Sequence, residues 1–198
     1  MVRFIAGGVG TLVVLGIAGV AYVYSGWFDV AASSPHNALE RWALNTTMKR
    51  SVVAGARSVG DPPPFSDEMF KDGFEHYDEM CTVCHGGPGI ERSEIGKGLN
   101  PQAPNLTDAV KAWTPRQLFW IIKHGVKMTG MPSFGATHDD DEVWSIVAFI
   151  EKLPGMSAEQ YRQFKQESFG GTREPMTHHY GGATDDPKPS APESASGK

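Results

Sequence analysis

Cysteine is scarce in this chain of 198 residues, which contains only two. Two cysteines cannot supply a cysteine-only zinc site, because zinc takes four ligands. No segment alternates apolar and polar residues as strands do, and the chain has no internal repeat. It also lacks a basic stripe, and its formal net charge is -5. These absences argue against a β-sheet fold and against nucleic acid as a partner.

One long apolar run lies near the N-terminus. No charged residue occurs between Phe4 and Phe28, and Phe4–Tyr24 is apolar or small throughout. As a helix these 21 residues would be about 31 Å long, enough to cross the hydrocarbon core of a bilayer. We interpret 1–28 as a retained transmembrane anchor, because the run is long and no A-x-A cleavage motif closes it. The alternative is a cleaved signal peptide. In either interpretation the N-terminus is inside and the remaining chain is exported.

Residues 29–62 are predicted to form a juxtamembrane amphipathic helix and a stiff proline-rich spacer. The helix is expected over Asn37–Arg57, where apolar residues recur at helical spacing beside arginines and lysines. Three interpretations stay open for it: lying on the lipid surface, docking on a partner subunit, or packing on the next domain. At the other end, 157–198 is predicted to hold one extra helix and a disordered tail from about Gly170.

Helical patterns occupy most of the chain between these ends. Three longer helices are expected at Ser66 to about Met80, from Thr114 to Gly125, and from Asp139 or Asp140 to about Leu153. Residues 86–112 are rich in glycine and proline and are expected to be a loop. So long an irregular segment is typical of a chain that wraps a ligand. The predicted fold class is therefore all-α.

The stretch Cys81-Thr82-Val83-Cys84-His85 has the spacing of a c-type haem attachment motif. Two thiols one helical turn apart can reach both vinyl groups of one porphyrin and form thioethers. The next residue, His85, can then ligate the iron. A thioredoxin-type pair would belong to a βαβ pattern that is absent here, and a structural disulfide is the other alternative. One covalent haem c bound by Cys81, Cys84 and His85 is the predicted cofactor.

The iron needs a second axial ligand from a loop that folds back over the porphyrin. Met131 is the first choice, because it follows Gly130 and precedes Pro132, which stiffens the loop. Met128 is the nearest rival, and its ordinary role would be to fill space in a core. His124 would instead give two histidine ligands.

This combination of features resembles class I cytochrome c over about Ser66–Leu153. The resemblance is carried by a helix with Gly73 and Tyr77, then CTVCH, then Pro104-Asn105-Leu106, then KMTGMPSFG at 127–135, then EVWSIVAFI at 142–150. It implies a class I cytochrome c fold over 63–156 around one haem. It also implies that the first and last helices of that domain cross closely at Gly73.

The resemblance further assigns roles to single residues. Pro104 matches the proline whose carbonyl accepts a hydrogen bond from the proximal histidine, a contact that fixes the ring tautomer. Leu106 matches a leucine that packs on the haem. Met131 matches the distal methionine, so that His85 and Met131 would be the two iron ligands.

Histidine–methionine ligation fills both axial positions and leaves one-electron transfer as the function. We therefore expect an electron carrier, not an enzyme, with a single span in a bacterial inner membrane and its haem domain in the periplasm. Its expected partners are redox proteins, among them a membrane oxidoreductase or a terminal oxidase or reductase of a respiratory chain. Two alternatives stay open: a haem-bearing subunit of a larger membrane oxidoreductase complex, and a haem sensor or enzyme with a labile distal ligand.

Overall fold

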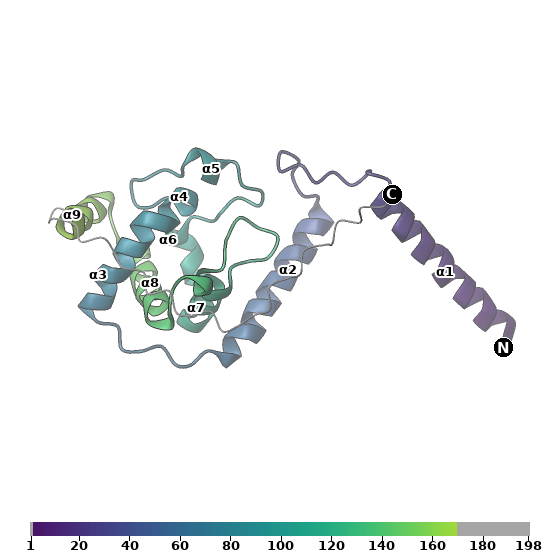
Figure 1. Ribbon diagram of the computed structural model, residues 1–198, viewed down its shortest axis with the longest axis horizontal. Coiled ribbons are helices and arrows are strands. Elements are labelled where there is room, and N and C mark those ends of the chain that lie inside the picture. Colours follow the sequence, from purple (N-terminus) through teal and green to yellow (C-terminus); the bar gives the residue numbers. More distant parts are fainter. Residues whose placement is uncertain (1, 170–198) are drawn as a thin grey trace, which may run out of the picture.

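The computed structural model describes residues 2–169, and their regular elements are helical (Figure 1). The helices are α1 (Val2–Tyr24), α2 (Ala38–Gly55), α3 (Asp67–His76), α4 (Thr82–His85), α5 (Glu94–Lys97), α6 (Leu106–Ala109), α7 (Pro115–His124), α8 (Asp140–Lys152) and α9 (Ala158–Phe169). Pairing of β type is limited, in this part of the chain, to one isolated bridge between Gly87 and Ile90. The all-α prediction is confirmed, and the predicted disordered tail lies outside the described residues.

Helix α1 extends away from the other helices (Figure 1). Its segment Arg3–Tyr24 has 22 residues and a mean hydropathy of 2.2, and none of its most apolar stretch is buried in the protein. The helix is therefore long and apolar enough to cross a membrane. A signal sequence near the N-terminus would pass the same test of length and composition. Helix α1 is therefore a candidate membrane span.

Helix α2 begins and ends close to its predicted bounds. Asn37 caps it by accepting a hydrogen bond from the Glu40 backbone, and the Glu40 carboxylate accepts one from Asn37 N, each at 2.9 Å. Burial is confined to its C-terminal part, where Val52 is 1% exposed. Leu39 and Trp42 are 70% and 66% exposed. The apolar residues of α2 therefore lie on two sides of the helix: Val52 packs on the globular part, whereas Leu39 and Trp42 do not.

The core is organised by the crossing of α3 and α8 (Figure 1). Gly73 of α3 lies against the α8 backbone, and a Cβ at this position would stand 1.9 Å from the Ser145 carbonyl oxygen. Phe74 and Val147 are both fully buried in the core that these helices enclose. The close crossing at Gly73 implied by the resemblance is thus present.

Helix α9 packs into this same core. Tyr161 is fully buried, and its ring lies edge-on to Phe74 with the centroids 5.2 Å apart. Phe164 makes a similar contact with Phe70 at 4.9 Å. Because aromatic pairs of this geometry add to the free energy of burial, α9 is an integral part of the globular fold.

The predicted loop at 86–112 contains more regular structure than its composition indicates. The side chain of Ser93 accepts a hydrogen bond from Gly96 N and begins α5, and that of Asn105 accepts one from Thr107 N and begins α6. Each of these helices is a single turn of four residues. Turns this short give no periodic signal, which is why the prediction of a continuous loop was wrong in detail.

Candidate functional site

The Cys-x-x-Cys-His segment lies at the end of a helix that changes its pitch. α3 passes into a π-helical turn at Tyr77–Cys81, and α4 then carries the rest of the segment to His85. The Thr82 hydroxyl donates to the Asp78 carbonyl at 2.7 Å and helps to hold this junction. Helix geometry brings Cys81 and Cys84 to neighbouring positions on one face, as residues three apart are.

The His85 ring is fixed by a hydrogen bond at one of its two nitrogens. Nδ1 lies 2.9 Å from the Pro104 carbonyl oxygen. A carbonyl can only accept, so Nδ1 carries the proton and the lone pair of the neutral ring is on Nε2. Burial lowers the pKa of His85, and the guanidinium of Arg92 acts in the same direction. The imidazole is therefore neutral at pH 7 and can ligate a metal through the lone pair on Nε2.

The two cysteines are free thiols and half-buried. Burial, followed by the nearby Cys84, raises the pKa of the Cys81 thiol to about 12. Reactive cysteines in redox pairs have the opposite shift, because the thiolate is the nucleophile. The raised pKa of Cys81 therefore argues against a thioredoxin-type redox pair.

The two candidate methionines of the 126–133 loop have opposite environments. Met131 is half-buried and packs against the core, and its backbone N–H donates to the Thr129 hydroxyl at 3.1 Å. Met128 is 82% exposed and has a positive φ of 61°. His124 lies exposed at the end of α7 with its ring on Trp120. Of the three candidates, only Met131 faces the interior.

The same loop is held close to α7 by Gly125. This residue ends α7 with a φ of 65°, and a Cβ on it would lie 2.5 Å from the Pro132 carbonyl oxygen. Val126 N donates to the Met131 carbonyl at 3.2 Å. The glycine therefore allows the Met-Pro pair to return against the end of the helix.

Pro104 and Leu106 follow each other at the start of α6. Pro104 is exposed apart from its carbonyl contact, whereas Leu106 is half-buried and packs against the core. The structure joins His85 to Pro104 by a hydrogen bond and packs Cys81, Leu106 and Met131 against the same core. Their roles in binding haem stay predictions.

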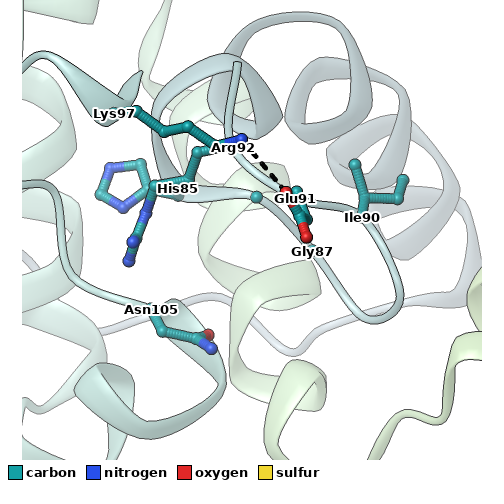
Figure 2. Close-up of a pocket in the computed structure, with 8 residues that line it drawn as sticks. His85, Gly87, Ile90, Glu91, Arg92, Lys97 and Asn105 are labelled. Atoms are coloured by element: carbon teal, nitrogen blue, oxygen red, sulfur yellow. Dashed lines mark hydrogen bonds and ion pairs between the residues drawn. The ribbon is translucent and has the colours of Figure 1, made fainter. Parts of the chain in front are cut away.

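A cavity of about 240 Å³ opens beside His85 (Figure 2). Its lining is polar and partly basic: His85, Gly86, Gly87, Ile90, Glu91, Arg92, Lys97 and Asn105. Lys97 forms an ion pair with Glu91 at 3.1 Å. Arg92 differs, because its Nε atom is buried and has no hydrogen-bond partner within the described residues.

Sequence reasoning did not single out Arg92. In the sequence it is one base among several between the motif and α7, and nothing local marks it. A buried donor without a partner among the described residues, beside a neutral imidazole in one cavity, fits a site that receives a further group. The chemistry of the candidate residues suits haem. Two thiols could form the thioethers, and the His85 nitrogen and the Met131 sulfur could ligate the iron.

The chain from Tyr77 to Gly86 is held by the Tyr77 side chain and is supported from α9. The Tyr77 hydroxyl donates to the Gly86 carbonyl at 2.7 Å, and that of Tyr161 donates to Asp78 at 3.1 Å. Lys165 also pairs with Asp78, at 2.9 Å. Burial raises the pKa of Tyr161, so its hydroxyl stays protonated and remains a donor. Helix α9 is thereby bonded to the turn that carries the cysteines.

Replacing Tyr161 by phenylalanine should lower the free energy of unfolding by about 1.5 kcal/mol, because a buried bond to a charged group is lost. Urea unfolding of the haem-loaded protein in mild detergent measures this. The control is Lys165→Met, which removes a half-exposed partner of the same carboxylate and should cost less than about 1 kcal/mol. Equal stability of Tyr161→Phe and wild type would contradict a stabilising role for the contact.

The comparison with known families agrees with this geometry. Residues 68–150 match the family model described as Cytochrome C oxidase, cbb3-type, subunit III. No curated protein matches the chain significantly. The matched segment contains the motif, Pro104, Leu106, Met131 and most of α8. Together with the all-helical fold, the match identifies residues 68–150 as a class I cytochrome c domain.

Proposed function

We propose that this chain is a membrane-tethered, monohaem c-type cytochrome that carries single electrons between respiratory or periplasmic redox partners. The cytochrome c domain supports haem-based electron transfer. The proposal goes beyond the family match in three respects: the membrane tether, the single covalent haem and the redox partners.

The proposed cofactor-binding residues are Cys81, Cys84, His85, Pro104, Leu106 and Met131. Cys81 and Cys84 would hold the haem through two thioethers, and His85 and Met131 would ligate its iron. A haem bound in this way supplies a one-electron iron couple. The observation that carries the proposal is the bond from His85 Nδ1 to Pro104, which leaves Nε2 as the only ring donor for iron. Leu106 supplies an apolar contact.

The proposed location is a bacterial inner membrane. Residues 1–28 are the single-pass anchor, with Arg3 on the cytoplasmic side in agreement with the positive-inside rule. The haem domain, 63–156, then lies in the periplasm, followed by the helix and tail of 157–198. A tether of this kind raises the effective concentration of the carrier near membrane-bound partners.

The test begins with the full chain, matured in a host that attaches haem c and purified in mild detergent. We expect one haem per chain that resists acid–acetone extraction, reversible one-electron titration, and no binding of carbon monoxide by the reduced protein. Haem that is extracted by acid–acetone would contradict the thioether assignment. Binding of carbon monoxide would instead favour a sensor or enzyme with an open site.

A second candidate function is a haem-bearing subunit of a larger membrane oxidoreductase complex. The observation in its favour is the family match itself, since that family is named for subunit III of a cbb3-type oxidase. Purification from the native membrane in mild detergent separates the two functions. A carrier elutes alone, whereas a subunit elutes with its complex.

A further inference from the structure

The outward side of α2 has a composition unlike that of an ordinary solvated helix. Leu39, Trp42 and Val53 are 70%, 66% and 40% exposed. At 100° per residue these three positions fall within a narrow arc of the helix surface. Thr46 lies within the same arc, and one base borders the arc on each side. We call these six residues the outer stripe: Leu39, Trp42, Thr46, Lys49, Arg50 and Val53.

The orientation of the outer stripe is fixed by what lies behind it. Val52 is buried, and a Cβ on Gly55 would lie 2.3 Å from Nε1 of Trp120 in α7. Beyond the helix, Arg116 donates to the Gly60 carbonyl at 3.1 Å. These contacts attach α2 to the globular part through one side, so that the outer stripe faces away from it.

The charges on the outer stripe are of one sign. Lys49 and Arg50 flank the apolar positions, and Arg57 follows shortly after the helix. The single acid of α2 is Glu40, which lies on another face and is engaged in the N-terminal cap. Exposed leucine, tryptophan and valine beside two bases can contact both the apolar and the anionic parts of a lipid surface. The local charge is positive although the whole chain is acidic.

The outer stripe is also held near α1. The connector between α1 and α2 is tied to the globular part where Asn100 Nδ2 donates to the Ser34 carbonyl at 2.8 Å. Only Ser25–Ser33 remains as a free tether, and a fully extended chain of that length reaches about 30 Å. Trp27 in this tether is 82% exposed, and tryptophan is enriched at bilayer interfaces. Figure 1 shows α2 between α1 and the other helices.

We propose that the outer stripe lies on the leaflet from which α1 emerges and binds anionic phospholipid. The apolar side chains enter the boundary between headgroups and acyl chains, and Lys49 and Arg50 contact the phosphate groups. This contact holds the globular part in one orientation at the membrane surface. The inference rests on the proposed function, since it requires α1 to be a membrane span.

The test uses the haem-loaded full chain in vesicles of phosphatidylcholine, with or without phosphatidylglycerol. A nitroxide is attached to a cysteine introduced by Thr46→Cys, in the outer stripe, or by Ser51→Cys, on an exposed position outside it. Wild-type protein, treated in parallel, reports any labelling of native thiols. Compared with pure phosphatidylcholine, phosphatidylglycerol should make the label at 46 severalfold less accessible to a water-soluble paramagnetic relaxation agent and more accessible to oxygen. The label at 51 should stay exposed to water in both kinds of vesicle.

Charge reversal tests the electrostatic part of the contact. In Lys49→Glu/Arg50→Glu, the label at 46 should return to the accessibility measured at 51. Equal water accessibility of both labels in wild type with phosphatidylglycerol would overturn the proposal. So would protection at 46 that is already present in detergent, because that result indicates a protein contact.

Failure of the anchor is detected separately. Alkaline extraction of the vesicles releases a peripheral protein but not one whose α1 spans the bilayer. Release therefore contradicts the proposed tether, whereas retention with a water-exposed label at 46 contradicts only the lipid contact of α2.

Discussion

Replacing Met131 by alanine should abolish the weak long-wavelength absorption band that thioether sulfur gives to oxidised haem. The midpoint potential should fall on the order of 0.1 V or more, because axial ligands set haem potentials over a range of about 0.8 V. The physical reason is that a thioether favours the reduced iron more than water or a nitrogen ligand does. Absorption spectra and a potentiometric titration of the purified protein measure both effects.

Met128→Ala is the matched control for this experiment. Met128 lies three residues away in the same loop but is 82% exposed, so its removal should change neither the band nor the potential. A band that persists in Met131→Ala and vanishes in Met128→Ala would reassign the ligand. Loss of the band in neither variant would contradict methionine ligation at this loop.

Replacing Gly73 by alanine should destabilise the fold by about 3 kcal/mol or more, at or above the upper end of ordinary overpacking. The added Cβ would lie 1.9 Å from the Ser145 carbonyl oxygen, and backbone cannot move aside as a flexible side chain can. The separation of α3 and α8 would have to increase, although alanine favours the helix itself. Urea unfolding of the haem-loaded protein measures the loss.

Gly60→Ala is the control, because nothing lies within 4 Å of a Cβ at that position. Its free energy of unfolding should stay within about 0.5 kcal/mol of wild type, as is usual for surface substitutions. A Gly73→Ala protein as stable as Gly60→Ala would mean that the two helices are not in backbone contact at this crossing.

The parts of the fold that depend on local signals could be predicted from the sequence. Ser66 caps α3 as expected, and Asp139, one of the two predicted caps, begins α8. Their signals lie within one turn of the helix that they start, so neighbouring residues are enough. The attachment motif is similarly local. Met131 was the first choice for the distal ligand because of its glycine and proline neighbours, and the family resemblance indicated the same residue. Its role as the distal ligand stays a prediction.

Features that depend on distant parts of the chain could not be predicted. The sequence shows the apolar positions of α2, but which of them pack depends on contacts with α7, a helix distant in sequence. The position of Arg92 beside His85 depends on how a long irregular segment folds back. The bond from Tyr161 to Asp78 joins residues 83 positions apart. No pattern within a short window carries that information.

The π-helical turn at Tyr77–Cys81 determines the direction in which the two thiols point around the helix axis. One extra residue in a turn rotates everything that follows by about 100° about the helix axis. The face of α3 that contacts α8 and the face that bears Cys81 and Cys84 are therefore set independently. Deleting a single residue in this turn would leave the packing of Phe70 and Phe74 intact while turning both sulfur atoms toward a different side.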